Sequence, residues 1–98
     1  MKKCKDELEK KLKRACKAIQ IMEMRKKRAE FSWQKATDFL DRLRAEQKVN
    51  PHAELEDKIY AAKLNWILED DLFEDAKIAH SKAVKKMNAI RLSYLRSR

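Results

Sequence analysis

Lys48-Val49-Asn50-Pro51-His52 lies near the midpoint of the 98-residue chain, and it contains the only proline of a sequence that has no glycine. A residue that precedes proline is disfavoured in the helical conformation, so Asn50 is predicted to end a first helix. Asparagine is also a favoured N-cap, and proline suits the first position of a helix. The stretch therefore predicts a tight turn at 49–51, with a second helix that begins at Pro51.

The stretch before the turn has the apolar spacing of a coiled coil. Between about residues 5 and 48, twelve positions alternate at intervals of four and three, and ten of them are apolar. Such spacing places the positions along one seam of a helix. The predicted seam is Leu8, Leu12, Ala15, Ile19, Met22, Lys26, Ala29, Trp33, Ala36, Leu40, Leu43 and Gln47. A break near 31–33 would give three helices in all, but neither glycine nor proline marks one.

The stretch after the turn repeats this pattern from about residue 51 to residue 95, and ten of its twelve seam positions are apolar. Its predicted seam is Leu55, Ile59, Ala62, Trp66, Glu69, Phe73, Ala76, His80, Ala83, Met87, Ile90 and Tyr94. A short link between long helices favours antiparallel neighbours. The sequence therefore predicts a single all-α domain over residues 1–98, a long antiparallel hairpin that is coiled-coil-like.

Apolar residues off the seam are more numerous than two helices can bury between them. They are Ile21, Met24, Phe31, Phe39, Leu64, Ile67, Leu68, Leu72, Ile78, Leu92 and Leu95. Contiguous exposed apolar surface is typical of an interface. Two hairpins that pair as a homodimer in a four-helix bundle would cover it, and so would a helix from another protein. The predicted partner-binding residues are Phe31, Leu64, Ile67, Leu68, Leu72 and Ile78.

Folding the chain at the turn is expected to place residue i opposite residue 100 − i. Trp33 is then expected to face Trp66 as an aromatic anchor of the packing. Lys26 and Glu69 occupy seam positions with opposite charges, where a polar pair lowers stability but fixes alignment. The residues predicted to have structural roles are Trp33, Trp66, Lys26, Glu69, Asn50 and Pro51.

Charge is distributed unevenly along the chain. The net charge of +9 favours an anionic partner. Residues 1–28 carry a net +8, residues 50–75 a net −6 and residues 76–98 a net +7. The hairpin would bring the two basic blocks together at the end that carries both termini. The residues predicted to bind nucleic acid or anionic lipid there are Lys10, Lys13, Arg14, Lys17, Lys82, Lys85, Lys86 and Arg91.

No cofactor, metal site or catalytic site is predicted. Cys4, Cys16, His52 and His80 lack the paired spacing of a zinc site. The acidic residues within 69–75 resemble one carboxylate pair of the MazG-type nucleotide pyrophosphohydrolases, but the matching Glu-Glu-x-x-Glu element is absent. Without glycine there is no phosphate-binding loop. The chain is therefore expected not to be an enzyme.

The cysteines and the apolar runs indicate a compartment. Cys4 and Cys16 would lie about 18 Å apart on one helix, too far for a disulfide within the chain. Two free thiols favour a reducing, cytoplasmic location. The basic start is not followed by the apolar core of a signal peptide, and no apolar run is long enough for a transmembrane segment.

The hairpin outline resembles those of small secretion chaperones, WXG-type secreted hairpins and phage-encoded regulators, although the Trp-x-Gly turn motif is missing. The residues themselves favour a non-enzymatic helical interaction protein, such as a small adaptor, chaperone or inhibitor. Such a protein would bind a partner, or itself, through the off-seam apolar residues. The alternative is a protein that binds nucleic acid or an anionic surface through the basic end of the hairpin.

Overall fold

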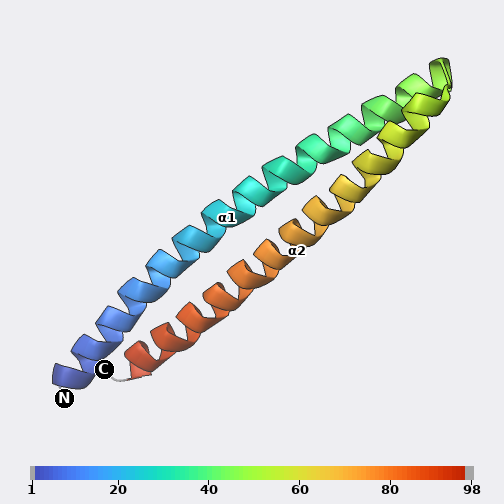
Figure 1. Cartoon of the computed structure of the whole chain (residues 1–98). Helices are drawn as coiled ribbons and strands as arrows, with labels where there is room; N and C mark the ends of the chain where they lie inside the picture. Colours follow the sequence, from blue (N-terminus) through green and yellow to red (C-terminus); the bar gives the residue numbers. More distant parts are fainter. Residues whose placement is uncertain (1, 97–98) are drawn as a thin grey trace. The chain divides into compact units, whose positions relative to one another are not determined.

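The computed structural model contains two helices joined by one connector (Figure 1). It describes residues 2–96, and the side chains of residues 6–96. Helix α1 spans Lys2–Val49 and helix α2 spans Ala53–Arg96. The predicted all-α helical hairpin is confirmed, and α1 continues without a break through residues 31–33. Two long helices fit a sequence that has no glycine and a single proline placed between them.

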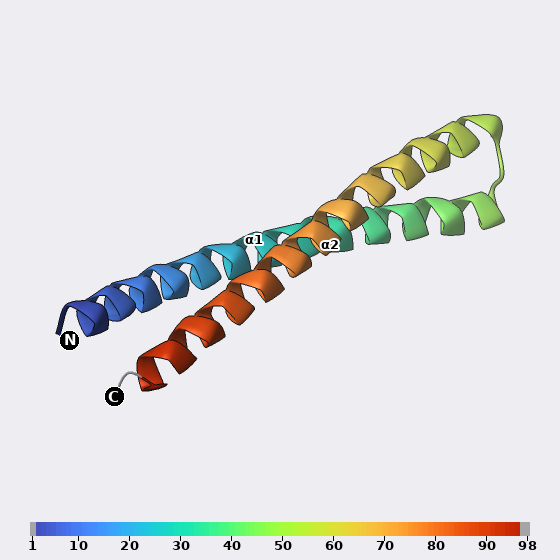
Figure 2. The ribbon, with the colours of Figure 1, turned by 90° about the horizontal axis from the view of Figure 1, so that it is seen from below.

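The connector has three residues, and Figure 2 shows it between the green end of α1 and the start of α2. The N–H of Asn50 donates to the carbonyl four residues earlier at 2.9 Å, and the N–H of Leu55 donates to the carbonyl of His52 at 3.1 Å. His52, not Asn50, therefore precedes the first residue of α2, which begins two residues after the predicted start at Pro51. The predicted link of one residue would span only about 3.6 Å, which is too short to join helices that pack about 8–10 Å apart. The connector is therefore longer than predicted.

Contacts within the chain separate it into two compact units. Unit 1 combines Met1–Lys26 with Ala76–Arg98, and unit 2 is Lys27–Asp75. Unit 2 contains the connector, whereas unit 1 contains the first part of α1 and the last part of α2. In each unit a segment of α1 packs antiparallel against a segment of α2.

Unit 2 contains a leucine-rich core. Leu40, Leu43, Leu55 and Ala62 are buried together, and Ile59 and Trp66 pack against them. Leu55 is 2% exposed, the lowest fraction among the described residues. The core lies on the predicted seam, so the four-three spacing identifies the faces that pack.

Unit 1 is packed less tightly along the same seam. Ala15 is its one fully buried apolar residue among the described side chains. The Sγ of Cys16 donates to the Sδ of Met87 at 3.8 Å, and the hydroxyl of Tyr94 donates to the Oε1 of Glu9 at 3.2 Å. These pairs fix an antiparallel register between the two segments.

The predicted seam is confirmed, but its register is displaced. Every predicted seam position on both helices is buried or half-buried. In unit 1 the contacts of Cys16 with Met87 and of Glu9 with Tyr94 place residue i opposite 103 − i, not 100 − i. The difference arises because α2 starts later than predicted, after a three-residue connector.

Candidate interaction surfaces

Four exposed apolar side chains follow one face of α2 within unit 2. Leu64, Ile67, Leu68 and Leu72 are 50–58% exposed. At about 100° per residue they lie on the side of the helix opposite the seam, so they face away from α1. We call these four residues the α2 stripe. Tyr60, one turn before Leu64, is also exposed and extends the same face.

Thr37 links the two helices behind the α2 stripe. Its hydroxyl accepts a hydrogen bond from Nε1 of Trp66 at 2.8 Å and donates to the carbonyl of Trp33 at 2.9 Å. The ring of Trp33 packs against Phe73, with centroids 5.6 Å apart and planes tilted by 41°. These are the contacts that the structure gives the two tryptophans, and the predicted pairing of Trp33 with Trp66 stays a prediction.

Sequence reasoning did not identify Thr37. A threonine inside a helix commonly bonds the carbonyl four residues earlier, which signals no role across the interface. Its contact with Trp66 depends on the register between the helices, and the sequence-based register was about three residues in error.

The six predicted partner-binding residues come from both helices and from both units. Phe31 is exposed on α1, where the Nζ of Lys35 lies 4.5 Å from its ring centroid in a cation–π contact. It faces away from the α1 seam, and so away from α2. Ile78 is exposed but belongs to unit 1. The α2 stripe gathers the remaining four residues on one face of α2 within unit 2.

Two acidic side chains lie among the residues of the α2 stripe. Asp71 and Asp75 are exposed on the same face of α2 as Leu64 and Leu68. Unit 2 as a whole has 8 basic and 12 acidic residues, a net −4. A partner that covers the stripe therefore meets negative potential from carboxylates within the same face.

Unit 1 has the opposite charge. It holds 17 basic and 4 acidic residues, a net +13. All eight predicted anion-binding residues belong to it and are exposed. Arg14 and Lys86 share a groove between the helices. Arg91 lines a separate hollow with Asn88, Leu92 and Leu95 on α2.

The groove of about 560 Å³ in unit 1 combines cations with an apolar floor. We call it the basic groove. Its residues are Lys11, Arg14, Ala15 and Ala18 of α1 and Ala83, Lys86 and Ile90 of α2. Lys11 was not among the eight predicted residues, although it lies three positions before Arg14, and so on the same helix face. None of the described residues that line the groove carries a carboxylate.

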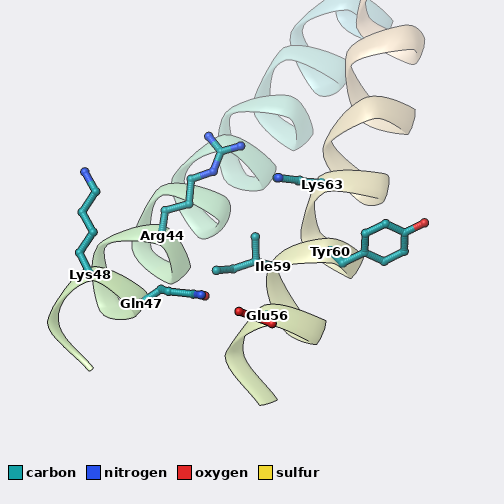
Figure 3. A pocket seen from close by; sticks show the side chains of 7 residues that line it. All are labelled: Arg44, Gln47, Lys48, Glu56, Ile59, Tyr60 and Lys63. Carbon is teal, nitrogen blue, oxygen red and sulfur yellow. The ribbon is translucent and has the colours of Figure 1, made fainter. Parts of the chain in front are cut away.

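A second hollow, of about 490 Å³, lies beside the connector in unit 2 (Figure 3). Gln47 and Ile59 point toward one another from the two helices, whereas Tyr60 and Lys48 point outward. The Oε1 of Gln47 is buried without a hydrogen-bond partner. Arg44, Lys48, Lys63 and Glu56 line the hollow along with these residues. This mixed charge selects no single class of ligand.

The remaining predicted residues are Lys26, Glu69 and the two cysteines. Lys26 is half-buried in unit 1, and Glu69 is half-buried in unit 2. Their pairing stays a prediction. Cys16 is a free, exposed thiol, and the side chain of Cys4 lies outside the described residues. The reducing compartment likewise stays a prediction.

Among side chains 6–96, no group of three histidine, cysteine, aspartate or glutamate residues is arranged to hold a metal ion. In the part of the chain that the structure describes, neither helix has a stretch long and apolar enough to cross a bilayer.

Comparison with known proteins adds no relative, since no family model, curated protein or solved structure matches the chain.

Proposed function

We propose that this chain is a non-enzymatic helical interaction protein, of the adaptor, chaperone or inhibitor kind, which binds an amphipathic helix on the α2 stripe. One observation carries the proposal. Four large apolar side chains remain half-exposed on the face of α2 that is opposite a fully formed seam. The hairpin itself does not need them for its own packing, so they are available to a partner.

The energetics favour a partner of moderate affinity. Fully burying a leucine or isoleucine contributes about 1.5–3 kcal/mol, so each half-exposed side chain offers roughly 1 kcal/mol. The four residues and an equal surface on the partner together supply about 8 kcal/mol. Association costs about 4–15 kcal/mol, which offsets much of this gain. We therefore expect a regulated or transient complex rather than a permanent one.

The charge of unit 2 selects the chemistry of the partner. Asp71 and Asp75 lie within the face that a bound helix would cover. An acidic helix would place like charges together, whereas a basic one pairs with both carboxylates. The partner is thus a basic amphipathic helix with apolar residues at intervals of three and four.

A labelled peptide tests this proposal. We expect a helical peptide of leucine and lysine with amphipathic spacing to bind the wild-type chain in a fluorescence anisotropy titration. The double variant Ile67→Ser/Leu68→Ser is expected to weaken binding by about tenfold or more, because it removes half of the apolar stripe. Circular dichroism checks that the helices remain.

The matched control removes two exposed aromatic residues from the other helix of the same unit. Phe31→Ser/Phe39→Ser is expected to leave the titration unchanged. A peptide of the same composition with scrambled spacing is expected not to bind. Equal loss in both double variants, or equal binding of the scrambled peptide, would show that the α2 stripe is not the binding surface.

A second candidate function is binding of nucleic acid or an anionic surface through unit 1. The net charge of +13 and the three cations of the basic groove favour it. Phosphate contacts of this kind are weakly specific and fall steeply with salt. Reversing the charges of Lys10, Lys13, Lys82 and Lys85 is expected to weaken binding to duplex DNA. Affinity that survives this reversal, or that ignores salt, rules the second candidate out.

A further inference from the structure

The basic groove has the shape and chemistry of a site for a third helix. Three of its floor residues, Ala15, Ala18 and Ala83, are alanines. Small side chains on two neighbouring helices let another helix approach to the usual packing distance of about 8–10 Å. Lys11, Arg14 and Lys86 surround this floor with positive charge. The helix that fits presents apolar side chains to the floor and carboxylates to the surrounding cations.

The α2 stripe is a helix face of that description. Leu64, Leu68 and Leu72 recur every four residues, with Asp71 and Asp75 beside them. From Leu64 to Leu72 the helix rises about 12 Å, and from Lys11 to Ala18 the α1 wall of the groove rises about 10 Å. The two surfaces therefore match in length, in charge and in apolar content.

We propose that the α2 stripe of one copy of this chain packs into the basic groove of a second copy. This rests on the proposed function of the α2 stripe and names its partner. Contact between unlike faces is favoured over stripe-to-stripe pairing, because the latter would bring the carboxylates of Asp71 and Asp75 against those of the second copy. Groove-to-groove pairing would likewise oppose cations.

Nucleic acid and anionic lipid are poorer occupants of the groove. Neither needs a floor of alanines, and no aromatic ring lines the groove for a base to stack on. An acidic amphipathic helix uses the floor and the cations together. The chain carries such a helix itself, in unit 2.

Two charge-reversed variants test the contact from both sides. The groove variant is Lys11→Glu/Lys86→Glu, and the stripe variant is Asp71→Lys/Asp75→Lys. Each alone would place like charges at the contact, so each is expected to weaken self-association about tenfold or more in sedimentation velocity. An equimolar mixture is expected to recover association, because each intact surface then meets a complementary one.

Matched controls reverse the same number of charges at exposed positions outside the proposed contact. Lys13→Glu/Lys17→Glu alters α1 of unit 1 outside the groove, and Asp38→Lys/Asp41→Lys alters α1 of unit 2. Both controls are expected to associate as the wild type does. All proteins are treated with nuclease at high salt before they are compared, which removes bound nucleic acid.

The outcomes separate this inference from the proposed function. Failure of the mixture to associate overturns the inference, as does a groove variant that associates normally. A nuclease-treated wild type that is monomeric also overturns it. In each case the peptide titration still decides whether the α2 stripe binds a basic helix of another protein.

Discussion

The heptad seam runs through both unit 2 and unit 1, but its side chains are buried more completely in unit 2. Among the described residues unit 2 buries five apolar side chains, whereas unit 1 buries only Ala15. Unit 2 also has the Thr37 link and the ring contact of Trp33 with Phe73. The contacts across unit 1 include a thiol–thioether pair and a tyrosine–glutamate bond.

The difference shows that spacing selects the packed face, while side-chain volume and charge decide how well it packs. The seam of unit 2 carries Leu40, Leu43 and Leu55, whose side chains fill the space between the helices. Alanines line the hollow in unit 1. A net +13 in unit 1 adds repulsion, whereas unit 2 is near balance at −4.

Truncating one seam leucine in each unit should give the largest contrast. Leu55 is fully buried, so Leu55→Ala is expected to lower the free energy of unfolding by about 2–5 kcal/mol. Leu12 is half-buried in unit 1, and Leu12→Ala is expected to cost about half as much. Urea denaturation followed by circular dichroism measures both losses. Equal losses would mean that the two units are packed equally well.

Removing the hydroxyl of Thr37 tests the link between the helices. Thr37→Val leaves the Nε1 of Trp66 without its acceptor, which is expected to cost about 1–3 kcal/mol. Both tryptophans lie in unit 2, so their fluorescence reports that unit during denaturation. Thr37→Ser keeps the hydroxyl and is expected to lose less. A valine variant as stable as the wild type would show that the link contributes nothing.

Replacing Gln47 with an apolar residue is expected to raise stability. Its Oε1 is buried without a partner at a seam position, so Gln47→Leu is expected to raise the free energy of unfolding by about 1 kcal/mol. Lys48→Leu, at an exposed neighbouring position, is the control and is expected to give no gain. A loss of stability in Gln47→Leu would mean that the amide has a partner in solution.

Salt should affect the two units differently. Screening weakens the repulsion in unit 1, so about 0.5 M salt is expected to stabilise that unit by about 0.2–1 kcal/mol. Unit 2 has little net charge and is expected to change less. Amide hydrogen exchange, resolved by residue, measures each unit separately. Equal protection at both salt concentrations would show that charge does not cause the looser packing.

The sequence predicted the seam well and the register less well. Four-three spacing identified all the buried positions, because periodicity alone determines which side of a helix is apolar. The predicted register was displaced by about three residues because the connector has three residues, and a spacing pattern does not measure the length of a loop. The link through Thr37 depends on that register, so the four-three spacing could not predict it.

The candidate surfaces were predicted in part. The surplus of apolar residues on α2 was visible as positions off the seam. Phe31 lies on the outer face of α1, which the seam spacing already indicates, so it does not share a helix face with the α2 stripe. Charge counts identified the basic end, but only the packed helices show that Lys11, Arg14 and Lys86 meet around one groove.

The most direct test is the solution mass of the nuclease-treated chain, measured by light scattering for the wild type and for Ile67→Ser/Leu68→Ser. We expect the wild type to associate at low salt and to dissociate toward the monomer as salt rises, while the double variant stays monomeric throughout. A double variant that associates as the wild type does would contradict the central role of the α2 stripe.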